Sequence, residues 1–266
     1  MIVDFPVLLI YVVSDGDWRA AMNITSNRID YRVGDDIHQA RLVSDDSPSA
    51  KRPGVILLHE WWGVNDYMLE RAHLLAELGY VALAIDMYGN GRVANNPDEA
   101  GELMNGVLDD MAAGTAALRA GYQLLLEQAS VDADKTAAIG YCFGGAMVLH
   151  MARIGMPLSA VASFHGALGS FHTAEPGSIR SRILVCHGEA DSMVTMDDLA
   201  GLRAEMETAQ ANYEVRLYAD AKHGFSSRKA DANGSQYGID VGYNAVADQE
   251  SWQAMKSLFD EVFQEQ

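Results

Sequence analysis

The chain has 266 residues, of which 49% are hydrophobic and 21% are charged, so it carries enough apolar side chains for a full core and global disorder is excluded. The formal net charge of −18 argues against nucleic acid as a partner, because phosphates require basic patches on the protein. No apolar run approaches the ~20 residues that cross a bilayer, so no membrane partner is expected.

Two cysteines, Cys142 and Cys186, are too few for a disulfide scaffold and fit a reducing, cytoplasmic compartment. The opening stretch MIVDFPVLLIYVVSD is apolar, but it lacks the basic region and the clear cleavage site of a signal peptide. Residues 1–25 are interpreted as an N-terminal extension, with three readings open: a natural start at Met22, an edge strand, or a surface arm. Residues 26–266 are expected to form a single domain.

The first half of this domain predicts strands and helices in alternation. Two alternating stretches within residues 28–44, on either side of Gly34, predict a β-hairpin. The apolar runs at residues 55–60 and 80–89 are typical of strands that are covered on both faces. Between them, residues 66–79 have helical spacing and end at a glycine. A long helical stretch is then predicted over residues 97–128.

The second half continues the alternation. Strands are predicted at residues 136–142, 158–166, 182–188 and 213–220. Helices are predicted at residues 143–155, 197–210 and 244–263. Buried strands that alternate with helices indicate an α/β fold, a mostly parallel central sheet with helices on both faces. Ligands of such sheets bind at the carboxyl ends of the strands.

Reactive residue types follow the predicted strands directly. They are Glu60, Asp86, Cys142, His165, Asp191 and His223. The strand interiors, in contrast, are inert aliphatic residues. Because the carboxyl ends of parallel strands share one edge of the sheet, we expect these groups to gather at one rim.

The stretch GYCFGG, residues 140–145, places Cys142 inside a frame of glycines. It fits the pattern G-x-nucleophile-x-G, in which a strand turns sharply into a helix and exposes the central residue. The glycines let neighbouring backbone pass close to that residue, and the helix N-terminus favours the thiolate. The alternative is a buried cysteine with packing glycines around it.

The chain order Cys142, Asp191, His223 matches the nucleophile–acid–histidine order of α/β-hydrolases. His223 can take and return a proton, and Asp191 can fix its tautomer and stabilise the imidazolium. Each residue alone has a plain structural alternative, a turn aspartate or a surface histidine. Three matches in the right strand contexts favour the catalytic interpretation.

On these motifs the sequence resembles the dienelactone hydrolase family, cysteine hydrolases with the α/β-hydrolase fold, over residues 29–263. The stretches that carry the resemblance are HEWWGVNDYM, YVALAIDMYG, GYCFGGAMV, HGEADSMV and AKHGF. The resemblance implies a single α/β-hydrolase domain over residues 26–266. It also implies hydrolysis of a small ester or lactone, since the best-known members hydrolyse dienelactone, a cyclic ester.

The resemblance gives Glu60 a role, because a glutamate at this position in the family pairs with the resting cysteine and helps to form the thiolate. A carboxylate at the end of a buried strand is costly unless it is paired or functional, and a structural hydrogen-bonded glutamate is the alternative. Two backbone N–H groups, of Trp61 and Phe143, are expected to form the oxyanion hole.

The sequence departs from the family at two substrate-binding arginines. At the first position it has Gly89-Asn90-Gly91, with Arg92 displaced downstream, and at the second Arg228 lies one place further from the histidine. Arginines at such positions are more often solvated surface residues than pocket residues. Loop changes that bring either arginine to the pocket stay open as the alternative, so the sequence leaves open whether dienelactone itself is the substrate.

Further candidates for substrate binding are aromatic or polar residues at the same rim. They are Trp62, Tyr88, His165, Phe225 and Arg228. The aromatic residues favour neutral or weakly polar acyl groups, with core packing as their alternative, and His165 has a structural role as its alternative. No ligand spacing for a metal and no phosphate loop is found, so no metal and no cofactor is expected.

The sequence thus predicts a cofactor-free cysteine hydrolase of a small ester or lactone, a monomer or homodimer. Cys142, His223, Asp191 and Glu60 are the predicted catalytic residues. Two alternatives stay open: a thioesterase or other hydrolase of larger acyl substrates, and a binding or redox protein that uses the thiol on the same fold.

Overall fold

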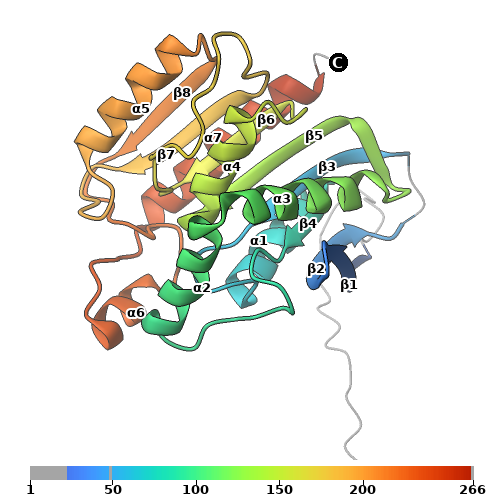
Figure 1. Ribbon diagram of the computed structural model, residues 1–266, viewed down its shortest axis with the longest axis horizontal. Coiled ribbons are helices and arrows are strands. Elements are labelled where there is room, and N and C mark those ends of the chain that lie inside the picture. Colours follow the sequence, from blue (N-terminus) through green and yellow to red (C-terminus); the bar gives the residue numbers. More distant parts are fainter. Residues whose placement is uncertain (1–22, 48–49, 265–266) are drawn as a thin grey trace, which may run out of the picture.

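The structure is a computed structural model that describes residues 23–47 and 50–264. Most of the predicted extension, residues 1–22, lies outside the described residues. Within them, eight strands form one sheet in the order β1-β2-β4-β3-β5-β6-β7-β8 (Figure 1). Their bounds are β1 Ile24–Val33, β2 Asp36–Asp45, β3 Arg52–Leu58, β4 Val81–Ile85, β5 Val131–Tyr141, β6 Ala160–Phe164, β7 Arg182–Gly188 and β8 Tyr213–Tyr218.

Two antiparallel pairings open the sheet, and the others are parallel. The hairpin strands β1 and β2 pair antiparallel, and β2 pairs antiparallel with β4. From β4 through β3 to β8 every pairing is parallel. Gly34 has a φ of 60° in the tight turn of the hairpin, a conformation that glycine adopts without steric cost. The predicted hairpin is confirmed.

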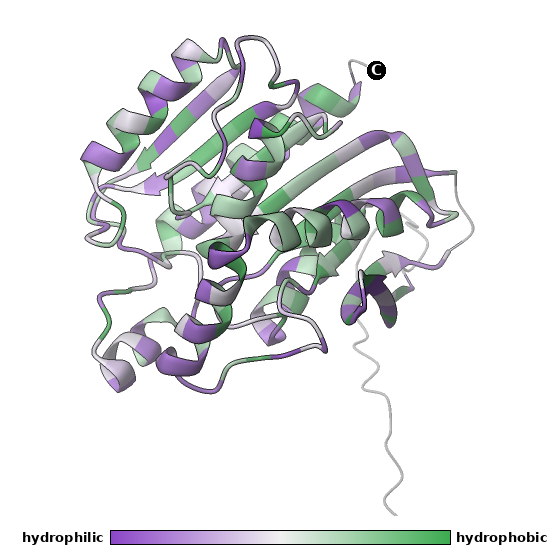
Figure 2. Cartoon of the chain, in the orientation of Figure 1, coloured by the Kyte–Doolittle hydropathy of each residue, from purple (hydrophilic) through white to green (hydrophobic). Residues whose placement is uncertain are grey.

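Helices cover both faces of the sheet, as predicted. Their bounds are α1 Asp66–Glu77, α2 Pro97–Asp109, α3 Met111–Leu126, α4 Phe143–Arg153, α5 Met196–Thr208, α6 Ala230–Tyr237 and α7 Ala245–Gln264. Alternate residues of β3 show the two layers: Ile56 packs in a cluster with α3, α4 and α5, and Leu57 packs in a second cluster with α1 and α7. Figure 2 shows the apolar colour of the central strands between helices whose outer faces are polar.

The helical stretch predicted over residues 97–128 is confirmed, and a break that was not predicted divides it into the two helices α2 and α3. Asp110 has a φ of −127° and a ψ of 73°, which breaks the helix, and its side chain accepts a hydrogen bond from the N–H of Ala113 to begin α3. The short helix α6 was not predicted, since its sequence ADANGSQY is poor in helix-forming residues. The predicted end of α1 at Gly79 is confirmed, with a φ of 90° at that glycine.

The β-strand ends bring the site together. Strands β3, β4, β5, β6 and β7 run parallel, so the segments that follow them lie at one edge of the sheet. None of the helices in the described part of the chain is both long and apolar enough to pass through a bilayer.

Candidate active site

Cys142 lies between the end of β5 and the first turn of α4. Its φ is 53° and its ψ is −115°, a strained conformation for a residue with a side chain. Its backbone N–H donates to the carbonyl oxygen of Phe164 over 3.0 Å, which fixes the turn to β6. The thiol is half-buried at the N-terminus of α4, where the helix dipole favours negative charge.

The glycines around Cys142 are required by close backbone contacts. A Cβ at Gly140 would lie 2.1 Å from the carbonyl oxygen of Gly144, and a Cβ at Gly144 would lie 2.3 Å from the carbonyl oxygen of Leu58. A Cβ at Gly145 would lie 2.7 Å from the Cα of Gly166. No side chain fits at these three positions, so the tight strand-to-helix turn that presents Cys142 depends on them.

Asp191 and His223 are joined by a hydrogen bond at the ends of β7 and β8. The Nδ1–H of His223 donates to Oδ2 of Asp191 over 2.9 Å. The other carboxylate oxygen accepts from the backbone N–H groups of Met193 and Val194, both over 2.9 Å. The aspartate side chain is fully buried, so its orientation is fixed by three donors.

The Nε2 atom of His223 is buried, and it lies on the same cavities as Cys142. Burial disfavours the imidazolium, but the charge of Cys142, the hydrogen bonds of the ring to Asp191 and Cys142 and the charge of Asp191 outweigh it and raise the pKa of His223 to about 10. An imidazolium is thus the form of His223 that the site stabilises beside a thiolate.

Glu60 follows β3 and lies on a cavity that Cys142 and His223 also line. Burial raises the pKa of its carboxyl to about 7, although the positive charges of His223 and Arg71 act in the opposite direction. Arg71 is held by the carbonyl oxygen of Ser226 over 2.7 Å and by an ion pair with Asp248 over 2.5 Å. Glu60 therefore changes its charge in the neutral pH range.

The backbone N–H groups of Trp61 and Phe143 have no hydrogen-bond partner among residues 23–47 and 50–264. The loop that carries Trp61 is fixed by Tyr88, whose hydroxyl donates to the Trp61 carbonyl oxygen over 2.9 Å. The ring of Tyr88 also stacks on Phe143, with the ring centroids 5.9 Å apart. Tyr88 therefore contacts both Trp61 and Phe143, the two residues whose backbone N–H groups are free.

Two cavities meet at Cys142 and His223. The apolar compartment has a volume of about 240 Å³, and beside these two residues it is lined by Trp61, Met104, Leu108, Phe143, Ala146, Ala167, Phe171, Met193, Val194, Ile239 and Val241. The second compartment, of about 30 Å³, is called the polar compartment because Glu60, Ser227 and Asn233 line it, together with the apolar residues Trp61, Trp62, Ala230, Ile239 and Val241. Glu60, Trp62, Ser227 and Asn233 also line an outer hollow of about 200 Å³. A carboxyl, a hydroxyl and an amide group therefore lie on the polar compartment, and none of these lies on the apolar one.

Of the predicted substrate-binding residues, Trp62 lies on the polar compartment. Three others lie elsewhere. His165, with a φ of 40°, is fully buried behind His223, with ring centroids 5.4 Å apart, and bonds to Ser226 Oγ over 2.7 Å. Phe225 is fully buried in the core cluster with α1 and α7, and Arg228 is 72% exposed beside Glu70.

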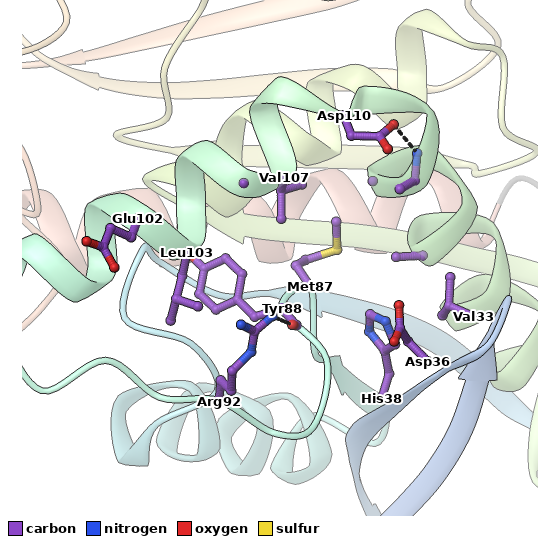
Figure 3. A pocket seen from close by; sticks show the side chains of 14 residues that line it. Val33, Asp36, His38, Met87, Tyr88, Arg92, Glu102, Leu103, Val107 and Asp110 are labelled. Atoms are coloured by element: carbon purple, nitrogen blue, oxygen red, sulfur yellow. Dashed lines mark hydrogen bonds between the residues drawn. The ribbon is translucent and has the colours of Figure 1, made fainter.

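Tyr88 and Arg92 line a different, larger cavity of about 420 Å³ between the β1–β2 hairpin and the helices α2 and α3. Figure 3 shows Arg92 and Tyr88 beside Leu103 in this cavity, which Cys142 does not line. The Arg92 guanidinium donates to the carbonyl oxygens of Tyr88 and Gly89, so it is engaged by its own loop.

Sequence reasoning missed most of the walls of the apolar compartment. Met104 and Leu108 belong to α2, whose apolar face gave no sign that it covers a site rather than a core. Ile239 and Val241 follow the unpredicted α6, and a backbone bridge joins Val241 to His223. Met193 and Val194 lie two and three residues after Asp191, and this proximity was the one available signal. No group of three His, Cys, Asp or Glu side chains suited to a metal ion occurs in the described part of the chain.

Known proteins with similar sequences and folds support one family. The sequence model of the dienelactone hydrolase family matches residues 39–263. The solved structure of m3DLH is 37% identical, with a TM-score of 0.84, and the match covers 90% of this chain and 98% of that one. A dienelactone hydrolase-like promiscuous phosphotriesterase from metagenomic libraries is 34% identical, with a TM-score of 0.82 and the same coverage of 90% and 98%.

Among the curated relatives, a probable 2-oxo-3-(5-oxofuran-2-ylidene)propanoate lactonase of Bradyrhizobium sp is 27% identical over 220 residues, which cover 77% of this chain and 82% of the relative. The family match spans most of the chain, and the sheet and its helices agree with the solved relatives. The chain therefore belongs to the dienelactone hydrolase family, and it is a hydrolase of carboxylic ester or lactone substrates on the α/β-hydrolase fold.

Proposed function

We propose that this hydrolase uses Cys142 as its nucleophile, with His223 and Asp191 as the other members of a catalytic triad. The observation that carries the proposal is the position of Cys142 at a strained turn on the same cavities as Nε2 of His223, whose Nδ1–H is held by Asp191 over 2.9 Å. Nε2 of His223 is the atom from which a proton can pass to a substrate.

In the first step, Sγ of Cys142 attacks the carbonyl carbon, the bond from that carbon to the leaving oxygen breaks, and Nε2 of His223 gives its proton to that oxygen. In the second step, water attacks the thioester and gives a proton to Nε2, and the C–S bond breaks to release the acid and the thiolate. Asp191 stabilises the imidazolium in both steps.

The free N–H groups of Trp61 and Phe143 are suited to bind the oxyanion of each tetrahedral intermediate, and one such donor is typically worth ~3 kcal/mol of barrier. Glu60 is suited to accept the thiol proton of Cys142 before attack, because burial raises the pKa of its carboxyl to about 7. These roles extend the triad proposal to the loop after β3.

The test is release of p-nitrophenol from short p-nitrophenyl esters by the wild type, Cys142→Ala and Cys186→Ala. Cys186 is the matched control, since it is fully buried in β7, where burial raises the pKa of its thiol to about 12. Turnover is expected to be lost in Cys142→Ala alone, and mass spectrometry of the quenched wild type should find one acyl group on Cys142. Undiminished turnover by Cys142→Ala would refute the proposal.

A second activity is suggested by the relative that is named a promiscuous phosphotriesterase. In this reaction the same thiolate attacks the phosphorus of a neutral aryl dialkyl phosphate, the bond from phosphorus to the aryl oxygen breaks, and His223 gives its proton to that oxygen. Water then attacks the phosphorus and gives a proton to His223, and the P–S bond breaks to release the dialkyl phosphate and the thiolate. Paraoxon in the same assay tests this. The activity, if it resides in this site, is lost together with ester hydrolysis in Cys142→Ala.

We also propose that the protein works in the cytoplasm, as a monomer or homodimer. Both cysteines are free thiols, which a reducing compartment preserves. Size-exclusion chromatography with light scattering measures the oligomeric state.

A further inference from the structure

Apart from the proposed triad, the apolar compartment has no charged side chain on its wall. Of the described residues that line it, His223 is the one basic residue, and none is acidic, an amide or an aliphatic alcohol. Its polar side-chain groups are the thiol of Cys142, the imidazole of His223 and the indole N–H of Trp61. The charge of His223 is balanced by Asp191 and the thiolate at the reacting end, so a charged substituent at the far end of an acyl chain would have no partner.

The walls of the apolar compartment come from segments that are far apart in the sequence. Met104 and Leu108 of α2 form one wall, and Val194, after β7, belongs to another. Phe171 and Met193 also line it, and they are 42% and 52% exposed. The apolar surface thus continues from the cavity to the molecular surface, where exposed large apolar side chains often mark a binding groove.

The two arginines that could have supplied a positive charge do not line this compartment. Arg92 is bound by the carbonyl oxygens of Tyr88 and Gly89 and lies on the cavity beside the hairpin (Figure 3). Arg228 is 72% exposed and its guanidinium lies 3.5 Å from Glu70. A carboxylate in the apolar compartment would therefore lose its hydration without gaining an ion pair.

The carboxyl, hydroxyl and amide side chains of the site lie on the polar compartment and not on the apolar one. Glu60, Ser227 and Asn233 line the polar compartment, and the outer hollow that shares them also has Lys229 and Asn95 on its wall. The leaving alcohol must depart and water must enter between the two chemical steps, whereas the acyl group stays on the sulfur. A polar, solvent-connected side suits the leaving group, and the apolar side suits the acyl group.

We propose that the natural substrate has an uncharged, apolar acyl group, which binds in the apolar compartment, while its leaving group lies on the polar side. This inference rests on the proposed function, because it takes Cys142 as the residue that carries the acyl group. It excludes substrates with a carboxylate on the acyl chain, and it makes Met104, Leu108 and Val194 residues that determine specificity.

The test compares two esters that differ in one group. p-Nitrophenyl pentanoate ends in a methyl group, and mono-p-nitrophenyl glutarate has a carboxylate in its place on an otherwise identical acyl chain. The spontaneous hydrolysis of each ester, which is faster for the glutarate because its carboxylate attacks the ester intramolecularly, is subtracted as background, and the two values of kcat/KM are compared directly. The wild type is expected to prefer the pentanoate by about 100-fold or more, since a site with no partner for a charged group rejects it strongly.

The net charge of −18 could also repel an anion from a distance, so the comparison is repeated in 0.5 M NaCl, which screens such repulsion beyond about 4 Å. The preference is expected to persist in salt. A preference below about 5-fold, or one that vanishes in salt, would overturn the inference while leaving the hydrolase proposal intact. Absence of Cys142-dependent turnover of the pentanoate would instead overturn the proposed function.

The second measurement uses a variant that places a positive charge on the wall of the apolar compartment. Met104→Lys is expected to reduce the preference for the pentanoate by about 10-fold or more, because an ammonium group now faces the acyl chain. Val246→Lys, at a position that is 64% exposed and does not line the compartment, adds the same charge and should leave the preference unchanged. An equal change in both variants would refute the assignment of the acyl group to this compartment.

Discussion

The hydroxyl of Tyr88 donates a hydrogen bond of 2.9 Å to the carbonyl oxygen of Trp61, so a residue that follows β4 holds the loop that follows β3. The same ring stacks on Phe143 in the first turn of α4. One side chain therefore contacts both residues whose N–H groups are proposed to bind the oxyanion. This contact makes Tyr88 a positioning residue rather than a substrate contact.

Tyr88→Phe is expected to lower kcat by about 10-fold and to leave KM nearly unchanged, because it keeps the stacked ring and releases only the Trp61 loop. The free energy of unfolding should fall by ~1 kcal/mol, the net contribution of one hydrogen bond. Steady-state kinetics and urea unfolding measure both. Tyr80→Phe is the control, since that ring packs on Phe259 far from the site and should not change kcat. A change in KM alone would contradict the positioning role.

Asp191→Asn is expected to lower kcat/KM by about 100-fold or more, because the amide that replaces Oδ2 cannot accept the proton of His223 Nδ1. The fold of the loop should persist, since Oδ1 still accepts from Met193 and Val194. Asp30→Asn provides the control: this exposed aspartate of β1 pairs with Arg28, and the loss of its charge should leave kcat/KM within about 2-fold. Equal activity of wild type and Asp191→Asn would remove Asp191 from the triad.

Glu60→Gln is expected to stabilise the fold above pH 7. Burial raises the pKa of Glu60 from 4.5 to about 7, so the native state holds a proton that the unfolded chain has lost between these values. Wild-type stability therefore falls as the pH rises through this range, and the neutral amide avoids that loss. The variant should gain about 1 to 3 kcal/mol at pH 8 and nothing near pH 4.5.

Urea unfolding at the two pH values measures this difference for Glu60→Gln. Glu250→Gln, at an exposed position of α7, controls for the removal of one negative charge and should show no such gain. If Glu60→Gln is no more stable than the wild type at pH 8, other interactions in the native state offset the free-energy cost of burying the charged carboxylate. Its kcat on p-nitrophenyl esters should fall at the same time, since the amide cannot accept the thiol proton.

Gly140→Ala is expected to destabilise the protein by more than about 3 kcal/mol or to prevent folding, because the new Cβ would lie 2.1 Å from the Gly144 carbonyl oxygen. Gly101→Ala is the matched control within α2, where a Cβ has nothing within 4 Å and should gain up to about 1 kcal/mol from helix propensity. Thermal unfolding compares the two variants. A Gly140→Ala protein as stable as the wild type would show that the turn can relax.

Local sequence patterns were sufficient for most of the fold. The hairpin at Gly34, the buried strands and the end of α1 at Gly79 follow from turn chemistry and periodicity, which act over a few residues. The break at Asp110 was missed because an aspartate is compatible both with a continuous helix and with the start of a new one. Helix α6 was missed because tertiary contacts, not propensity, determine it.

The sequence by itself determined which reactive groups follow the strands, and because parallel strands end at one edge, it also determined that Cys142, Asp191 and His223 would lie near one another. Only the tertiary structure decided what surrounds them. Three questions depend on distances between segments that are far apart in the chain. They are whether Arg92 reaches the thiol, whether His165 contacts substrate or supports His223, and whether α2 covers a core or a cavity. Such distances follow from the packing of the whole domain, which no local pattern encodes.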